Sequence, residues 1–414
     1  MNIWLIHLGE LLPVDKGFRP FRYTYLAEAL SERGHHVIRW APTFVHATKQ
    51  YRASRNAIVE INEFYKIILL HGPGYRKHVG IQRILFHYRM AYAFLKLAQK
   101  LSLPDIIVVG MPTPEMVWSA VRYGEKHHVP VVIDIRDIWP DVFYDMLPKP
   151  VRKIGTLLTW PMRKMNAYSF RRATAIVGIS DSYLDWGIEY ADRKRSKQDR
   201  VFHMGYRRLS LDDSTFLTLK RTWVKRGVRP DSFLCVFFGT IGHQFDLETV
   251  IQAARYLQDM KEDVQFIICG DGERLAHYKA LANNVHNVLF PGWVSSEEIA
   301  ALVKMAKVGL APYRSKAKMS LPNKPFEYMA GGLPILSSLK GDLEIILQEF
   351  GCGITYEPGD VNGFVRSLLL LKKNDATYSA MRQNAESLFE KHFSADIIYP
   401  AFVDYLESVI EESK

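Results

Sequence analysis

The most informative stretch of the chain is Met319-Ser-Leu-Pro-Asn-Lys-Pro-Phe-Glu-Tyr-Met-Ala-Gly-Gly-Leu-Pro-Ile-Leu336. It predicts a loop at Leu321–Asn323, a short helix that begins near Pro325, and a buried strand after the glycine pair. Proline is tolerated in the first turn of a helix and glycine at its end. Glu327 then lies in the first helical turn, near backbone N–H groups without intrahelical partners. A carboxylate there can bind sugar hydroxyls while those N–H groups bind phosphate.

Apolar runs alternate with helical periodicity along both halves of the chain, which is typical of a parallel sheet covered on both faces. Strands are predicted at 2–8, 37–40, 105–110, 131–134, 175–180, 233–238, 264–269, 288–290, 308–311 and 335–338. Helices are predicted at 22–33, 114–127, 246–257, 273–282, 296–305 and about 399–412. We therefore predict an α/β fold of two doubly wound, Rossmann-like domains that face a cleft.

The length of 414 residues also favours two domains. The polar, basic stretch Gly205–Pro230 has no sustained apolar period and is predicted to be a linker. We place an N-terminal domain at 1–205 and a second domain at 206–395.

Three glycine-bearing turns follow strands of the second half: Gly239-Thr240-Ile241-Gly242-His243, Gly270-Asp271-Gly272 and Gly292-Trp293-Val294. Glycines between a strand and a helix allow backbone N–H groups to approach a pyrophosphate. The alternative is that these glycines serve only packing. Trp293 is either a base-contacting residue or a core aromatic at a domain edge.

The first half carries a charged tract at a strand end, Ile133-Asp134-Ile135-Arg136-Asp137-Ile138-Trp139-Pro140. Ligand sites of α/β folds lie at the carboxyl edge of the sheet. Arginine does no proton chemistry at neutral pH, but it can bind a phosphate or a hydroxyl. The alternative is a purely structural pairing of Arg136 with Asp137.

Together these tracts resemble the retaining GT-B glycosyltransferases of family 4, in a sub-branch of bacterial surface-polysaccharide (O-antigen and capsule) transferases. The resemblance extends over nearly the whole chain. It implies transfer from a nucleotide-diphosphate sugar without a cofactor or a metal ion, and a C-terminal helix (about 396–414) that crosses back onto the first domain. Glu327 matches the second glutamate of the family's E-x7-E motif, whereas Met319 occupies the place of the first.

The resemblance also implies the site residues. Many family members carry phosphate-binding cations where this chain has Thr240 and Gln244 or Phe245. Lys324, His243 and Arg274 are therefore the candidates to replace them. The predicted donor-binding residues are Gly239, Thr240, Gly242, His243, Gly270, Asp271, Gly272, Trp293, Val294, Pro322, Asn323, Lys324 and Glu327. The predicted catalytic residues are Asp137, Arg136 and Glu327, and the acceptor side is assigned Gly17, Arg19, Arg22 and Asp134.

The net charge of +10 indicates an anionic partner or an ordinary basic surface. Nucleic acid is disfavoured because the basic residues do not form one block interleaved with aromatics. They concentrate at Arg76–Arg89, Lys149–Arg172 and Arg193–Arg200, which fits an anionic membrane surface or a diphosphate-linked lipid acceptor. Basic helices with an apolar face are predicted at 147–172, where Pro161 should bend or break the helix, and at 87–97. Ordinary core packing would account for both helices as well.

No apolar run reaches the length of a membrane span, and three cysteines in apolar contexts suggest a reducing compartment. We expect a cytoplasmic protein, peripheral on the inner face of the cell membrane. Two other functions stay open: a catalytically silent GT-B partner subunit and a nucleotide-sugar epimerase. UDP is favoured as the nucleotide, although main-chain recognition of the base leaves few side-chain signals. The donor sugar, acceptor, linkage and oligomeric state are not defined by the sequence.

Overall fold

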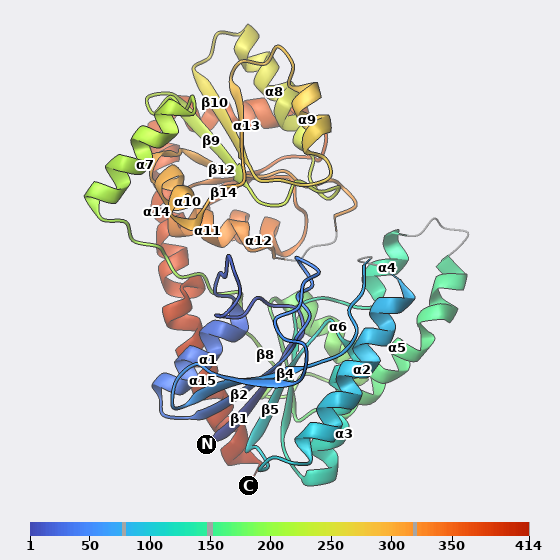
Figure 1. Cartoon of the computed structure of the whole chain (residues 1–414). Helices are drawn as coiled ribbons and strands as arrows, with labels where there is room; N and C mark the ends of the chain where they lie inside the picture. The colour runs from blue at the N-terminus through green and yellow to red at the C-terminus, as the bar shows by residue number, and fades with distance from the viewer. Residues whose placement is uncertain (77–79, 147–151, 318–320, 414) are drawn as a thin grey trace. The chain divides into compact units, whose positions relative to one another are not determined.

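A computed structural model describes residues 1–76, 80–146, 152–317 and 321–413. The chain forms two compact units, Met1–Gly205 with Ile398–Lys414, and Tyr206–Ile397. Each is an α/β unit in which helices cover both faces of one sheet (Figure 1).

Among its described residues, the first unit has one eight-stranded sheet in the order β3-β4-β2-β1-β5-β6-β7-β8. β3 pairs antiparallel with β4, and the other pairs are parallel. The strands are β1 Asn2–Ile6, β2 His36–Pro42, β3 Ala57–Glu60, β4 Tyr65–Leu70, β5 Ile106–Gly110, β6 Val131–Ile135, β7 Ala175–Gly178 and β8 Arg200–Val201. The helices are α1 Arg22–Glu32, α2 Ile81–Ala98, α3 Pro114–His127, α4 Asp141–Met146, α5 Arg152–Arg172 and α6 Asp181–Ala191.

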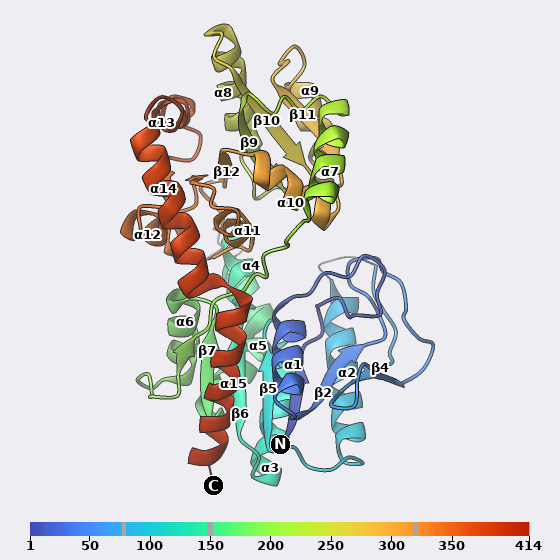
Figure 2. The same cartoon turned by 90° about the vertical axis from the view of Figure 1, so that its left-hand side faces the viewer.

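Helix α3 packs against both α2 and α5 on one face of this sheet, and α1 with the C-terminal part of α15 (Ala395–Glu412) lies on the other (Figure 2). Aromatic rings fill the space beneath α2 and α3. Trp4 lies edge-on to Trp40 at 5.1 Å between ring centroids, and Phe94 contacts Trp40 at 4.9 Å. On the other face Phe402 of α15 stacks on Phe202 at 4.3 Å. Burial of these large rings stabilises the packing of helices on both faces of the sheet.

The second unit has, in its described part, a six-stranded parallel sheet in the order β11-β10-β9-β12-β13-β14. The strands are β9 Phe233–Phe238, β10 Val264–Cys269, β11 Val288–Gly292, β12 Val308–Ala311, β13 Ile335–Ser337 and β14 Gly353–Thr355. The helices are α7 Asp213–Lys225, α8 Leu247–Asp259, α9 Leu275–Leu281, α10 Ser296–Met305, α11 Lys324–Ala330, α12 Asp342–Glu349, α13 Val361–Lys373, α14 Asp375–Leu388 and the π-helical turn η2 Phe389–Phe393.

The predicted linker Gly205–Pro230 is wrong in its middle, where α7 forms. Asp212 caps this helix by accepting a hydrogen bond from the Thr215 N–H at 2.9 Å. Among the residues of α7 only Trp223 is buried, and its indole N–H donates to the Glu298 carbonyl at 3.0 Å. Phe216 and Leu219 are half-buried on the same face of α7 as Trp223, so its apolar repeat extends over only two turns, which is too short to establish a helical period from the sequence.

Pro161 was predicted to bend or break its helix, and the break is wrong, because α5 continues through this residue. A proline removes one hydrogen bond and costs about 3 kcal/mol in a helix interior. Packing of α5 along α3 and α6 offsets that cost. Within the described residues, no helix has the length and apolar character needed to cross a bilayer.

Candidate functional site

The glycine turns of the second unit meet at the carboxyl edge of its sheet. The Gly239 N–H donates to the Cys269 carbonyl at 3.1 Å, and the Gly270 N–H donates to the Gly292 carbonyl at 2.7 Å. Gly239 and Gly270 have φ values of 141° and 134°, and a Cβ on Gly270 would overlap the Gly239 carbonyl. These positions therefore require glycine for conformation and for close approach. Thr240 follows at the exposed tip of the first turn.

Lys324 lies against the first of these turns. A Cβ on Gly239 would collide with the Lys324 side chain, and the ammonium lies 4.6 Å from the Phe245 ring and 5.6 Å from the Phe237 ring. Burial lowers the pKa of the Lys324 ammonium to about 8, against an opposing effect of Glu327. The structure thus brings a partly desolvated cation to the turn where phosphate binding is predicted.

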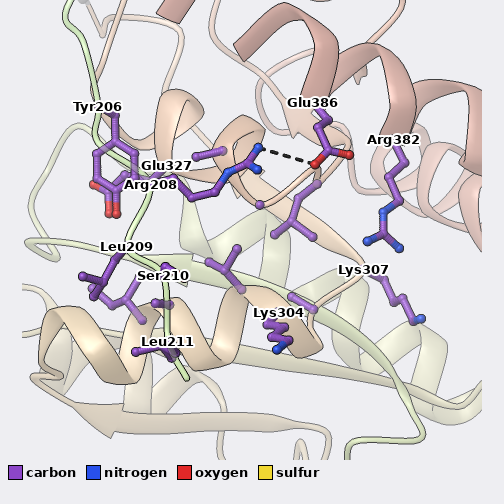
Figure 3. Close-up of a pocket in the computed structure, with 17 residues that line it drawn as sticks. Tyr206, Arg208, Leu209, Ser210, Leu211, Lys304, Lys307, Glu327, Arg382 and Glu386 are labelled. Atoms are coloured by element: carbon purple, nitrogen blue, oxygen red, sulfur yellow. Dashed lines mark hydrogen bonds and ion pairs between the residues drawn. The ribbon is translucent and has the colours of Figure 1, made fainter. Parts of the chain in front are cut away.

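Glu327 lies one turn into α11 and is half-buried. It lines a cavity of about 280 Å³ between the segment Tyr206–Leu211, α10, α11 and α14. Its lining includes the apolar Ile299, Val303 and Leu333, and Figure 3 shows four basic side chains around the cavity, Arg208, Lys304, Lys307 and Arg382. Of the predicted donor-binding residues only Glu327 lines this cavity, so the cavity and the glycine turns are neighbouring surfaces that share α11.

Several other donor-side predictions can now be placed. Trp293 is 69% exposed, which excludes the alternative of a core aromatic, whereas Val294 is buried. His243 is exposed and pairs with Glu273 at 3.3 Å. Arg274 pairs with Glu248 at 3.0 Å, as does His277 at 3.1 Å. These pairings leave Lys324 as the cation that contacts the glycine turn.

The other predicted donor-side residues lie in the glycine turns or at the start of α11. Asn323, at the N-terminus of α11, is exposed and makes no side-chain capping bond, whereas Pro322 is buried. Asp271 accepts a hydrogen bond from the Gly272 N–H at 2.7 Å. Gly242 is buried in the turn before α8. Met319 lies outside the described residues.

In the first unit, Arg136 pairs with Glu10 instead of Asp137, so the predicted alternative of an Arg136–Asp137 pair is wrong. The other Glu10 oxygen accepts from Arg39 at 3.0 Å, and the carboxylate also accepts from the Tyr23 N–H at 3.2 Å. The Arg136 side chain stays slightly exposed, and its pairing with Glu10 orients the guanidinium at the carboxyl edge of the sheet. Glu10 was missed, although a lone carboxylate directly after the first strand is a usable signal.

His7 is a second residue that sequence reasoning missed. It stacks on Tyr23 at 5.0 Å between ring centroids, and its Nε2 lies 3.4 Å from the Arg136 guanidinium. Burial, followed by the charges of Arg136 and Arg39, holds the pKa of His7 well below its usual value. The imidazole is therefore neutral at pH 7.

Arg22 and Asp134 form a buried ion pair. The Arg22 Nε lies 2.9 Å from Asp134 Oδ2, and the guanidinium also donates to the Phe202 carbonyl at 2.8 Å. Both side chains are almost fully inaccessible. The assignment of Arg22 to the acceptor side is therefore wrong, because its guanidinium joins α1 to β6 and the segment after β8. Asp134 is its structural partner.

Asp137 is half-buried, and burial raises its pKa against the effects of the Ile138 N–H and the nearby arginines. The Ile138 N–H donates to its carboxylate at 2.9 Å. Gly17, with φ of 72°, and Arg19 lie in the loop before α1, and Gly17 is exposed. In the described ranges, no group of three or more His, Cys, Asp and Glu residues is arranged to hold a metal ion.

The amino-acid sequence is similar to those of known proteins. Residues 221–388 match the family described as "Glycosyl transferases group 1". The chain is 25% identical over 176 residues to 2-deoxystreptamine N-acetyl-D-glucosaminyltransferase of Niallia circulans, a match that spans 42% of this chain and 44% of that protein. It is 24% identical over 385 residues to N-acetyl-alpha-D-glucosaminyl L-malate synthase of Bacillus anthracis, covering 91% of this chain and 90% of that protein.

Solved structures share the fold. Sucrose-phosphate synthase from Thermosynechococcus elongatus superimposes with a TM-score of 0.75 at 14% identity, over 99% of both chains. Anabaena HepE in complex with UDP-glucose superimposes with a TM-score of 0.65 at 13% identity, over 99% of this chain and 100% of that one. The superpositions confirm the prediction of two GT-B-type α/β domains. The match to the group 1 family confirms the prediction of a glycosyltransferase.

Proposed function

We propose that this chain, which carries a glycosyltransferase group 1 domain, is a retaining enzyme that transfers a sugar from a nucleotide-diphosphate sugar to a saccharide acceptor. The observation that carries the proposal is the Lys324 ammonium against the Gly239 turn. A desolvated cation beside a turn whose glycines have no side chains favours the close approach of a diphosphate. UDP is the proposed nucleotide, supported by the UDP-glucose complex of HepE, which has the same fold.

In the proposed reaction the bond between the anomeric carbon and the diphosphate oxygen breaks. The acceptor oxygen bonds to the same face of the sugar, and its proton passes to the departing phosphate. Lys324 neutralises the developing charge on the diphosphate without a metal ion, and Glu327 binds donor hydroxyls. Arg136, held by Glu10, and Asp137 position the acceptor side. Preorganised charges of this kind supply several kcal/mol of transition-state stabilisation.

We further propose a lipid-diphosphate-linked acceptor at the cytoplasmic face of an anionic membrane, as in bacterial surface-polysaccharide synthesis. The support is the α2–α5 surface, which we define as the exposed apolar side chains Ile81, Leu85, Tyr88 and Tyr92 of α2 and Leu157, Leu158 and Trp160 of α5. The α2 residues are spaced three or four apart and form one stripe. Leu157 and Leu158 are each 75% exposed, so core packing does not account for them.

Charge on the same two helices favours an anionic surface. The sequence of α2 carries three basic residues and that of α5 carries six, and neither contains an acidic residue. Both helices pack on α3, so their outer sides belong to the same layer (Figure 1). Apolar side chains flanked by lysine and arginine are typical of helices that lie in a membrane interface.

The donor assignment is tested by thermal unfolding with UDP, GDP, ADP, CDP and dTDP, on wild type and on Glu327→Ala and Lys324→Gln. A ligand at 100 times its dissociation constant adds about 2.7 kcal/mol to the stability of the folded state. We expect one diphosphate to raise the Tm of wild type by a few degrees and that of either variant by less. If no diphosphate changes the wild-type Tm, the donor site is wrong.

The reaction itself separates the competing functions. A transferase yields product whose anomeric configuration, read by NMR coupling constants, matches that of the donor. Tight nucleotide binding without turnover would favour the catalytically silent subunit, and conversion of the nucleotide sugar without acceptor would favour the epimerase.

Membrane association is tested by co-sedimentation with neutral phosphatidylcholine vesicles and with vesicles containing phosphatidylglycerol. Wild type should bind the anionic vesicles, and the double variant Leu157→Ser with Leu158→Ser should bind less. Leu217→Ser is the matched control, because Leu217 is an exposed leucine of α7. Equal binding of both variants would remove the α2–α5 surface from the proposal.

A further inference from the structure

The ammonium of Lys324 lies over two aromatic rings of its own unit. It is 4.6 Å from the Phe245 ring centroid and 5.6 Å from the Phe237 ring centroid. The two rings meet edge to face, with their centroids 4.9 Å apart. A cation within about 6 Å of a ring centroid is attracted by the negative face of the ring. Lys324 therefore has a cation–π contact with Phe245 and a longer one with Phe237.

No carboxylate takes the place of these rings. Among the residues that the structure describes, the Lys324 ammonium forms no ion pair, and Glu327 is the one charged group that raises its pKa. A carboxylate in direct contact would neutralise the charge that attracts a phosphate, whereas a ring attracts the cation and leaves its charge intact. The ammonium is thus held beside the Gly239 turn in a form that can still pair with an anion.

The Phe245 ring is held in place by its neighbours. It is buried, and it contacts the Phe237 ring and also the Tyr313 ring, both at 4.9 Å between centroids. The Phe245 carbonyl accepts hydrogen bonds from the Tyr278 hydroxyl at 3.0 Å and from the Arg314 Nε at 3.1 Å. Phe245 follows β9, Tyr278 follows β10 and Arg314 follows β12. Segments after three strands therefore fix the surface on which the ammonium lies.

The alternative is that the aliphatic stem of Lys324 merely packs on apolar surface, as lysine stems commonly do. Burial lowers the pKa of Lys324 to about 8, so the ammonium has lost part of its hydration. A cation–π contact is strongest for a desolvated cation, and the rings can replace part of the lost water. Stem packing depends on the shape of the ring, whereas cation–π attraction depends on the electron density of its face.

We propose that Phe245 is a positioning residue for diphosphate binding, whose ring holds the Lys324 ammonium at the Gly239 turn and favours its protonated form. Phe237 contributes the second, more distant ring. The inference rests on the proposed transferase function, since it explains how the cation assigned to the donor diphosphate is kept in place without an ion pair.

The test replaces Phe245 by mono-, di- and trifluorinated phenylalanine, introduced through a suppressor tRNA. Fluorine changes the size of the ring little and withdraws electron density from its face, which weakens the attraction for a cation. The same series at Phe266 is the matched control, because Phe266 is a buried ring of β10 that contacts Phe364 and, within the described residues, no cation. Circular dichroism melts establish that every variant is folded.

The first readout is the pKa of Lys324 in the free protein. NMR of protein whose lysines are isotope-labelled at Cε measures it, and the spectrum of Lys324→Gln identifies the signal. We expect the pKa to fall with each added fluorine at Phe245, by about half a pH unit for the trifluorinated ring, and to stay constant in the Phe266 series. Isothermal titration calorimetry at pH 9 should then show UDP binding about threefold weaker for trifluorinated Phe245, because less of the lysine is protonated.

The outcomes separate the inference from the proposed function. If the pKa is unchanged across the Phe245 series while Lys324→Gln weakens UDP binding, the inference fails and the donor assignment stands. An equal fall in the Phe266 series would also overturn the inference, because that ring does not contact the ammonium. If the pKa falls only in the Phe245 series but Lys324→Gln binds UDP as tightly as wild type, the cation–π contact stands, whereas the donor assignment and the positioning role both fail.

Discussion

Raising the pH from 7 to 9 should weaken binding of the nucleoside diphosphate by removing the proton of Lys324. Its pKa is about 8 in the free protein because burial disfavours the ammonium. If only the ammonium form binds, the apparent Kd scales as one plus ten to the power of pH minus pKa. The ratio between pH 9 and pH 7 is then roughly tenfold, or about 1.4 kcal/mol. The terminal phosphate, with a pKa near 6, is ionised throughout this range.

Isothermal titration calorimetry of UDP from pH 6.5 to 9.5 measures this dependence. Lys324→Arg keeps a charge across the whole range and should give a flat profile, whereas Lys324→Gln should bind weakly at every pH. A wild-type profile as flat as that of Lys324→Arg would refute the assignment of the cation.

Deprotonation of Lys324 also changes the free energy of unfolding, and this effect is favourable where the effect on binding is unfavourable. Between pH 8 and about 10.4 the unfolded chain keeps the lysine proton that the folded chain has lost, so the free energy of unfolding should rise with pH. The rise amounts to about 3 kcal/mol and should vanish in Lys324→Gln. Urea unfolding of wild type and of Lys324→Gln at pH 7.5 and 10 measures this difference in stability.

Three further predictions concern buried contacts. Gly270→Ala should lower the Tm by several degrees and abolish UDP binding, because a Cβ would overlap the Gly239 carbonyl at a positive φ; a normal melt would contradict the close approach. Arg22→Met should destabilise the chain by about 3–5 kcal/mol in urea unfolding, because it leaves Asp134 buried without its partner; a loss below about 1 kcal/mol would show that Asp134 is solvated. Glu10→Gln should lower kcat at least tenfold with little change in the Kd for UDP, since it frees Arg136 and leaves the second unit intact; an equal loss in UDP affinity would place Glu10 in donor binding.

Much of the fold was predictable because its strands are buried on both faces. Phe233–Phe238, Val264–Cys269 and Val308–Ala311 were predicted with the bounds that the structure has, since a short uninterrupted apolar run between turns is typical of a central parallel strand. The edge strand β3 and its neighbour β4 were not predicted. In β3 the burial alternates between half-buried and exposed, and four residues are too few to establish that period.

The candidate site was predictable where backbone geometry demands a residue type. Gly239 and Gly270 have positive φ values, so the glycine that each position requires is visible in the sequence. The partners of charged side chains could not be identified from the sequence in this way. Arg136 could have paired with Asp137 next to it, but it pairs with Glu10, 126 residues away, because β1 and β6 bring their carboxyl ends to one edge of the sheet. Likewise Arg22 was assigned to the acceptor side, whereas the fold of α1 buries it against Asp134.

The three cysteines offer an experimental opportunity. Cys235, Cys269 and Cys352 are unpaired and buried, and burial raises the pKa of each thiol. Thiols of this kind react slowly with maleimides. A single cysteine introduced in place of the exposed Thr240 would therefore be the only fast-reacting thiol of the chain. A fluorophore attached there would report nucleotide arrival at the glycine turn in real time, without the removal of any native residue from the core.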